Sequence, residues 1–212
     1  MIILSSIKKL LGRAYSLVTM PWHGVRYGKG CVLSFCDGHS ITGWGNFLQF
    51  GDGSQLNNCQ FIIKGGRNRI IVGSRCNMTG VSFWISGNNN EILIGDDTTV
   101  GRGTQFAALE GTKISVGSDC MFSHDIKVRT SDSHSIVDLE GKRINQAKDV
   151  TIGKHCWIGM QALIMKGSSL ADNTVLAARS TLNKPLEEAN CVVGGAPARI
   201  IKIGTNWDRK KL

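Results

Sequence analysis

A run of bulky aliphatic residues spaced six apart constrains this chain more than any other feature. The series is Ile152, Ile158, Ile164, Leu170, Leu176 and Leu182. Four residues after each of the first five stands a small residue: Cys156, Ala162, Ser168, Thr174 or Ser180. An amphipathic helix repeats at about 3.6 residues and a strand at about 2, so neither keeps this register. A triangular coil does, because each six-residue unit forms one short parallel strand and a corner, and the aliphatic side chains stack inside.

The same spacing continues upstream in longer turns. Three six-residue units make one turn of 18 residues. The glycine of an aliphatic-Gly-Asp/Ser pattern instead recurs every 22 residues, which is four residues more than such a turn. These glycines are Gly51, Gly73, Gly95 and Gly117. The extra residues fall at one corner, in the stretches 64–67, 87–90 and 110–112, which are rich in glycine and asparagine. Both residue types tolerate left-handed backbone. Residues 21–49 are less regular, and we expect one or two irregular turns there.

One segment breaks the pattern. Regular spacing stops after Val128 and resumes at Val150, with about 20 mostly polar residues between them. Because this segment begins at the corner that carries the extra residues, we predict a protruding loop at about 129–149. A long loop on a rigid solenoid is a common carrier of function. Pro185 ends the regular run, and residues 185–212 are predicted to fold back as a tail.

Length and charge bound the class of protein. The 212 residues, 42% of them hydrophobic, suffice for one domain over 1–212, with an N-terminal segment (1–20), coils (28–184) and the tail (185–212). The net charge of +9 favours anionic partners, such as phosphate-bearing cofactors, acidic polysaccharides or membrane surfaces. Zinc-finger, homeodomain, RRM and KH signatures are missing from the sequence, so we expect no nucleic-acid partner.

Two further features indicate the compartment. Seven cysteines form no CxxC pair, and three of them, Cys76, Cys120 and Cys156, occupy small inward positions. We interpret these three as core residues in a reducing cytoplasm rather than as metal ligands. Residues 1–20 have near-helical apolar spacing and predict a short amphipathic helix. It would cap the open end of the coil or, as the alternative, contact the inner face of a membrane.

The repeats resemble the hexapeptide-repeat acyltransferases, which are left-handed parallel β-helices. The resemblance covers roughly 50–184 and continues into Gly194-Gly195-Ala196-Pro197-Ala198-Arg199-Ile200, which is similar to the family's closing segment. The most similar subgroup contains bacterial polysaccharide and sialic acid O-acetyltransferases. In that subgroup a loop histidine precedes an aliphatic-Gly-x-x-x-Trp-Ile-Gly strand, matched here by His134 and by Ile152–Gly159. The implied fold is an all-β solenoid, whose left-handedness comes from the resemblance alone.

The resemblance implies that acetyl-CoA donates an acetyl group to a sugar hydroxyl of a surface polysaccharide or its precursor. An alcohol is a poor nucleophile at neutral pH, so the reaction needs a base, and the family pattern assigns that role to His134. His124 is the rival base, although we favour a structural role for it. Trp157 follows the inward Cys156 and is expected to point outward, where its indole N–H can donate to the reacting region.

The resemblance also implies binding residues and an assembly. The cofactor contacts would be the backbone around Gly159, Met160 and Ala178, with positive charge from Arg179, Lys184 and Arg199. The acceptor contacts would be Arg129, Asp132 and His155. A homotrimer with clefts between neighbouring coils is implied as well. Two departures from the family stand out: Arg179 within Leu176–Ser180, and Gly101-Arg102 in place of the acceptor asparagine of simple-sugar members, which favours an anionic acceptor.

Three alternatives remain open at this stage. An N-acetyltransferase acting on an amino sugar or nucleotide sugar would share the cofactor and the base. A metalloenzyme of the γ-carbonic-anhydrase kind would need three histidines with a close pair, which His124, His134 and His155 lack. A non-catalytic scaffold would use the coil only as an assembly surface.

Overall fold

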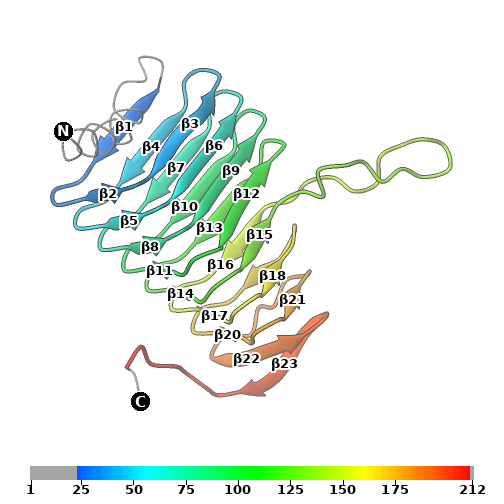
Figure 1. Ribbon diagram of the computed structural model, residues 1–212. Helices are drawn as coiled ribbons and strands as arrows, with labels where there is room; N and C mark the ends of the chain where they lie inside the picture. Colours follow the sequence, from blue (N-terminus) through cyan, green and yellow to red (C-terminus); the bar gives the residue numbers. More distant parts are fainter. Residues whose placement is uncertain (1–22, 211–212) are drawn as a thin grey trace.

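The structure, a computed structural model, describes residues 23–210, and the predicted N-terminal helix at 1–20 lies outside this range. Within 23–210 every regular element is a β-strand, and the strands wind into seven triangular coils stacked into a prism (Figure 1). Each coil contributes one strand to each of three parallel sheets, which we call faces A, B and C. No helix in the described part of the chain is long and apolar enough to cross a membrane.

The three faces take their strands in sequence order. Face A holds β1 (Gly24–Tyr27), β4 (Phe47–Phe50), β7 (Arg69–Val72), β10 (Glu91–Ile94), β13 (Lys113–Val116), β16 (Val150–Ile152) and β19 (Ser169–Leu170). Face B holds β2 (Val32–Ser34), β5 (Gln55–Asn57), β8 (Asn77–Thr79), β11 (Thr99–Val100), β14 (Met121–Phe122), β17 (Trp157–Ile158), β20 (Val175–Leu176), β22 (Cys191–Gly195) and β23 (Ala198–Ile203). Face C holds β3 (Asp37–Thr42), β6 (Gln60–Lys64), β9 (Ser82–Ser86), β12 (Gln105–Leu109), β15 (Lys127–Arg129), β18 (Leu163–Ile164) and β21 (Thr181–Leu182).

The strand register reproduces the periods in the sequence. Phe50 pairs with Val72 and Ile94 with Val116, each one long turn further along the chain. Ile152 instead pairs with Leu170, which is one short turn of three six-residue units away. The extra residues of the longer turns all lie at the corner between faces C and A, which we call the C–A edge. In the first coil β1 pairs with β4 and β2 with β5, whereas the register of β3 with β6 shifts between Asp37 and Ser40, which is one irregularity of the kind expected there.

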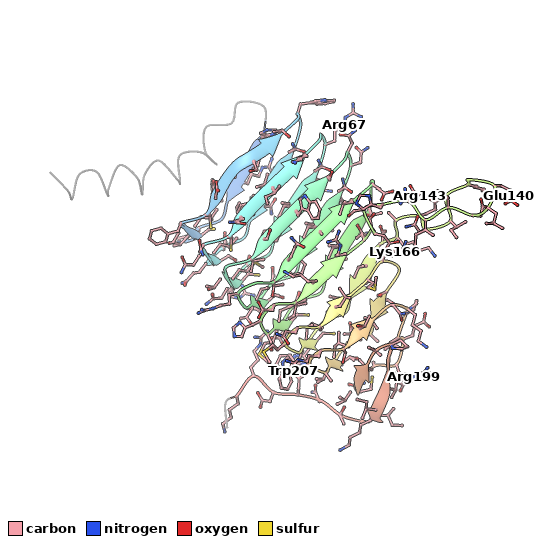
Figure 2. All side chains as sticks on the ribbon, turned by 45° about the vertical axis from the view of Figure 1, so that its right-hand side comes forward. Arg67, Glu140, Arg143, Lys166, Arg199 and Trp207 are labelled. Atoms are coloured by element: carbon pink, nitrogen blue, oxygen red, sulfur yellow. The ribbon has the colours of Figure 1, made fainter. Side chains whose placement is uncertain are left out.

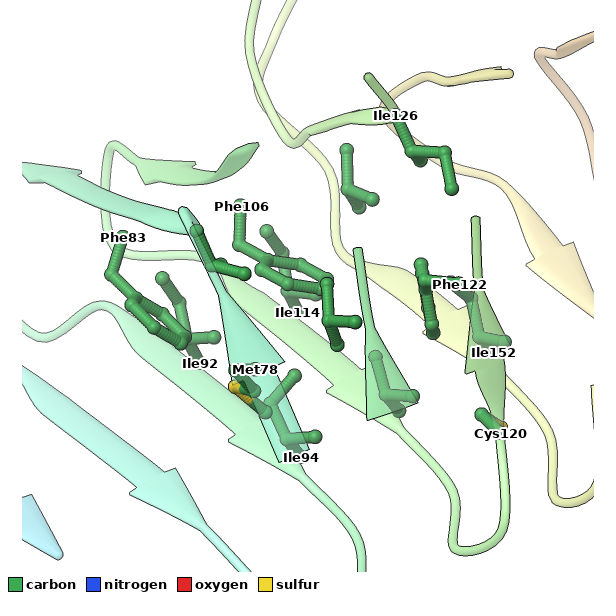
Figure 3. Packing of buried hydrophobic residues seen from close by; sticks show 14 of the residues in the cluster. Met78, Phe83, Ile92, Ile94, Phe106, Ile114, Cys120, Phe122, Ile126 and Ile152 are labelled. Carbon is green, nitrogen blue, oxygen red and sulfur yellow. The ribbon is translucent and has the colours of Figure 1, made fainter. Parts of the chain in front are cut away.

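The interior is filled as the six-residue pattern predicts. All six aliphatic residues of the series from Ile152 to Leu182 are 2% exposed or less, and so are the five small residues between them. Further up the coil, Phe61, Phe83 and Phe106 stack along the axis with ring centroids 5.1 and 5.8 Å apart. Figure 3 shows Phe83 and Phe106 of this stack. The inward cysteines are free and fully buried, and burial raises the pKa of the Cys76 thiol. They therefore act as small core residues, as expected.

A column of buried asparagines stiffens the C–A edge. The side-chain oxygen of Asn46 accepts hydrogen bonds from the backbone and side-chain N–H groups of Asn68, and Asn68 does the same for Asn90. The oxygen of Asn90 then accepts from the backbone N–H of Thr112 at 3.1 Å. We call this column the asparagine ladder. It holds four successive corner turns in register from inside.

The carboxyl end of the coil is closed by a hairpin and a strap. Strand β22 continues face B in parallel with β20, and β23 returns antiparallel to it. The tail then crosses back toward the corner between faces A and B. There Arg209 bonds the carboxylate of Asp119 at 2.7 Å and the backbone oxygen of Asp97 at 3.0 Å. The predicted fold-back of the tail is seen in residues 204–210, which we call the strap.

Candidate active site

The segment 130–149 leaves the C–A edge as a projecting hairpin, which we call the arm (Figure 1). Val137 and Arg143 form an antiparallel bridge, and the tip at 138–141 is a tight turn around Asp138. Large apolar side chains on the arm are exposed: Ile136, Val137, Leu139 and Ile144. A two-stranded hairpin is at best marginally stable by itself in water. These exposed side chains therefore suit the arm for contact with another surface.

Asn145 anchors the base of the arm. Its buried amide donates to the backbone oxygen of His134 at 2.8 Å and to the carboxylate of Asp132 at 2.7 Å. Its oxygen accepts from the backbone N–H of Ile136 at 2.7 Å. These three hydrogen bonds of one side chain thus hold the backbone on both sides of His134.

Ion pairs secure the same base. Arg143 donates two hydrogen bonds to Glu110, at 2.5 and 3.0 Å, and Lys166 pairs with Asp132. Figure 2 labels the two cations, Arg143 and Lys166, near the point where the arm leaves the coil. The hydrogen bond from Arg143 holds the pKa of Glu110 below its usual value, and that from Lys166 does the same for Asp132. Both carboxylates are therefore ionised at neutral pH, and the base of the arm is fixed.

His134 itself lies on the fixed part of the arm with its side chain exposed. The predicted acceptor residue Arg129 lies near it on β15, where its guanidinium carbon is 5.4 Å from the ring centre of Trp84 and its Nη2 donates to Ser133. Asp132, by contrast, is engaged by Lys166 and Asn145. The imidazole of His134 is thus accessible, while neighbouring residues hold the backbone that carries it.

Trp157 lies on face B, away from the arm of its own chain. It points outward as predicted and is 38% exposed. Its indole Nε1 donates a long hydrogen bond of 3.5 Å to the hydroxyl of Ser123 on the rung above. The C–A edge and face B are different sides of the prism, so one chain does not bring His134 and Trp157 together.

A hollow of about 470 Å³ on face B is lined in part by Ser123, the residue to which the Trp157 indole donates. Polar and basic side chains line it: Asn77, Thr79, Thr99, Arg102, Ser123 and His124. The ring of His124 lies over Gly101, where an added Cβ would stand 2.5 Å from its Nδ1. His124, the rival candidate for the general base, therefore lines this hollow, and Arg102 is a second basic group there.

Comparison with known proteins decides the family. No model of a known protein family matches the chain. A polysialic acid O-acetyltransferase of Neisseria meningitidis is 34% identical over 194 residues, which cover 81% of this chain and 90% of that protein. The crystal structure of the polysialic-acid-specific acetyltransferase NeuO superposes with a TM-score of 0.75 at 29% identity, covering 91% of this chain and 84% of NeuO. That of the polysialic acid O-acetyltransferase OatWY gives 0.69 at 30% identity, covering 90% and 92%.

The chain belongs to the hexapeptide-repeat acetyltransferases. It is an acyltransferase similar to the bacterial polysialic acid O-acetyltransferases, as its motifs indicated, and its coils form the left-handed parallel β-helix of that family.

The predicted donor-binding residues of the acetyltransferase fall into two groups. Gly159, Met160, Ala178 and Arg179 lie on consecutive rungs at the corner between faces B and C, where Arg179 donates to Gln161 at 2.9 Å. The rungs are so close there that a Cβ on Gly159 would stand 2.4 Å from the backbone nitrogen of Ala178. Lys184 follows β21 and Arg199 lies on β23, both exposed and near the carboxyl end of the coil.

His155 contacts the strap. Its Nδ1 lies 2.6 Å from Asp119, and its ring stacks on Trp207 at 4.4 Å between centroids. Trp207 is 8% exposed and lies 6.1 Å from the ring of Trp157. His155, the predicted acceptor residue, thus holds the tail against the coil, and Trp207 connects it to Trp157.

Sequence reasoning did not find the residues that build the base of the arm. Asn145 and Arg143 lie in a polar stretch without periodic signal, and Glu110 is in a corner turn. Lys166 lies between Ile164 and Leu170, where the six-residue pattern indicates no partner for its charge. The only usable signal was the presence of two acidic and two basic residues, Glu110, Asp132, Arg143 and Lys166, far apart along the chain. Which of these distant charges form ion pairs cannot be inferred from the sequence, because only the folded coil brings them together.

Proposed function

We propose that this acetyltransferase transfers the acetyl group of acetyl-CoA directly to a hydroxyl of an acidic bacterial surface glycan, with His134 as the general base. The observation that carries the proposal is the combination of an exposed imidazole on an anchored arm with a close likeness to polysialic acid O-acetyltransferases. The basic surroundings of the hollow, Arg102 and His124, favour an anionic acceptor. The free cysteines are consistent with a cytoplasmic site of action.

The proposed chemistry is a single displacement. The acceptor hydroxyl loses its proton to the imidazole of His134 while its oxygen attacks the thioester carbonyl. The new C–O bond forms, the C–S bond breaks, and the coenzyme A thiolate takes up the proton from the imidazolium. The indole N–H of Trp157, held only by a long bond to Ser123, would donate to the carbonyl oxygen as negative charge develops there.

The proposal places the site between two copies of the chain, in a trimer. His134 and Trp157 lie on different sides of one prism, whereas the arm carries exposed apolar side chains that need a partner surface. Trp157 and Met160, 38% and 44% exposed, provide such a surface on face B. The arm of one copy would therefore deliver His134 to face B of its neighbour. Symmetric homo-oligomers build shared sites in this way.

The donor acetyl-CoA is long and carries phosphates, so its binding groove requires positive charge. Met160 and Ala178 are exposed on successive rungs at one edge of face B, and Arg179 adds a positive charge next to them. Arg199 lies further along, at the end of the coil (Figure 2). This order matches acetyl-CoA, in which the pantetheine chain is followed by phosphates.

The test measures acetyl transfer from labelled acetyl-CoA to polysialic acid by mass. We expect His134→Ala to lower kcat by ~10²–10⁴-fold, because an exposed general base is removed while the fold is kept. Removal of the label by mild alkali separates an O-acetyl ester from an N-acetyl amide, and so tests the N-acetyltransferase alternative. His124→Ala is the companion variant: if it loses more activity than His134→Ala, the base is His124 and the assignment is overturned.

A further inference from the structure

An exposed tryptophan stands on the C–A edge, four corner turns before the arm. Trp44 is at the apex of the turn Gly43-Trp44-Gly45, where both glycines have positive φ, and it is 59% exposed. A Cβ on Gly43 would stand 2.1 Å from the backbone oxygen of Gly65 in the next turn. The turns are thus stacked in direct contact, and the indole is presented by a stiff support.

Arg67 of the next turn lies against this indole. Its guanidinium carbon is 4.5 Å from the ring centre, and its backbone N–H bonds the oxygen of Trp44 at 2.9 Å. A guanidinium stacked on an aromatic ring keeps its N–H groups available at the edge, where a carboxylate binds them in pairs. The pair therefore offers an apolar ring next to an oriented anion donor.

A hollow of about 210 Å³ is formed around this pair, lined by Trp44, Gly66, Arg67, Asn88 and Asn89. These lining residues include one cation, two amide side chains and no carboxylate. Asn88 accepts from the backbone N–H of Gly66 at 2.7 Å, which fixes its orientation. On neighbouring rungs, Glu91 and Glu110 are neutralised by their own arginine partners. The hollow thus combines an aromatic ring, amides and positive charge, the groups that bind an acidic sugar.

The hollow lies on the same edge as the arm. Figure 2 shows Arg67 and Arg143 along one line of corner turns, and the asparagine ladder stiffens that line beneath the surface. Four rung spacings separate the Trp44 turn from the base of the arm, about 19 Å at the usual distance between strands. A glycan chain that reaches His134 can therefore extend along the edge to Trp44.

We propose that Trp44, Arg67, Asn88 and Asn89 form a distal subsite for an acidic sugar residue of the acceptor chain, several residues from the one that is acetylated. The subsite makes the enzyme select polymers over short precursors. This inference rests on the proposed function for its acceptor, but it concerns a different surface and predicts binding without catalysis.

The experiment compares a long and a short acceptor. Polysialic acid and its trisaccharide are acetylated with labelled acetyl-CoA by the wild type, Trp44→Ala and Arg67→Gln. We expect each variant to lower kcat/KM for the polymer at least tenfold, and kcat/KM for the trisaccharide less than twofold. Arg75→Gln is the matched control, because Arg75 is an exposed arginine of the same coil at another corner, paired with Asp97. It should leave both acceptors unaffected.

A binding measurement separates this inference from the proposed function. Electrophoresis in gels containing polysialic acid or uncharged dextran reports polymer binding without turnover, so it works even if no acetyl transfer is found. We expect polysialic acid to retard the wild type and Arg75→Gln more than Trp44→Ala and Arg67→Gln, and dextran to retard none of them. Equal retardation of all four proteins overturns the inference. So does a raised KM for acetyl-CoA in Trp44→Ala, or a change in its oligomeric mass by light scattering, since the indole would then serve the donor or a subunit interface.

Discussion

Asn68 shows how much a single polar residue contributes in this coil. It is fully buried, and its amide bonds the rung above and the rung below at once. An apolar residue would pack equally well in the interior, but it would leave backbone groups of the corner turns without partners. The asparagine is thus placed where the turns with four extra residues need internal hydrogen bonds.

Asn68→Ala is expected to destabilise the protein. It leaves the buried backbone N–H of Asn90 without its hydrogen-bond acceptor, and a buried unpaired group costs about 1–3 kcal/mol. The midpoint of urea unfolding, followed by circular dichroism, should therefore fall. Asn57→Ala, an exposed asparagine on β5, is the control and should change the unfolding free energy by less than about 0.5 kcal/mol. Equal midpoints for the two variants would contradict a structural role for the ladder.

The arm is the element whose order depends on charge. Its base contains two carboxylates, Glu110 and Asp132, each bonded by a cation and each with a lowered pKa. Their partners come from different elements, since Arg143 lies on the arm and Lys166 on the coil beyond it. The ion pairs therefore tie the arm to the prism rather than only to itself.

The arm is expected to loosen in acid before the coil does. Because the pKa values of both carboxylates are lower in the folded protein, their contribution is complete above the unfolded values, near 3.8 for Asp132 and 4.5 for Glu110. The contribution is lost as the pH falls through the folded values. Amide hydrogen exchange in 132–146, corrected for intrinsic rates, should be slow from pH 7 to 5 and accelerate below about pH 4. Asp132→Asn should accelerate it already at neutral pH. Loosening of the wild-type arm between pH 7 and 5 would show that other groups hold it.

At the scale of the whole molecule, the prism separates His134 and Trp157, the two residues proposed to act in the reaction. Its stiffness comes from rungs in direct contact, so face B cannot bend to meet the arm of the same chain. Both the exposed apolar arm and the exposed Trp157 are explained if each faces another copy.

Mixing two inactive variants tests whether the site is shared. His134→Ala and Trp157→Ala are produced together and compared with each variant alone. If the arm of one copy serves face B of the next, a random mixture restores intact sites to about a quarter of the total, since cyclic assembly pairs the two chains independently at each interface. If both residues act within one chain, every site keeps a defect and no activity returns.

Much of this architecture was predictable because it repeats. The six-residue period and the longer period of the glycine pattern indicated the strands, the inward residues and the corner from which the arm leaves. The outward position of Trp157 followed from alternation beside Cys156. The strand pairing of the first coil was harder to foresee, because residues 24–50 satisfy the same rungs with less uniform side chains, such as Val25 and Leu33, which are only partly buried.

The strap and the base of the arm were not predictable. Arg209 reaches Asp97 across 112 positions, and Arg143 reaches Glu110 across 33. The contact of His155 with Trp207 of the strap was not foreseen either. Nothing local distinguishes such a histidine from a substrate ligand.

The sequence by itself determined the coil. Stacking similar rungs requires the same residue type at the same interval, and this periodicity is visible in the sequence. Only the tertiary structure decided which imidazole is accessible, which carboxylates are neutralised and which tryptophan borders a hollow. Those outcomes depend on pairs of side chains that meet through folding, at separations that follow no period.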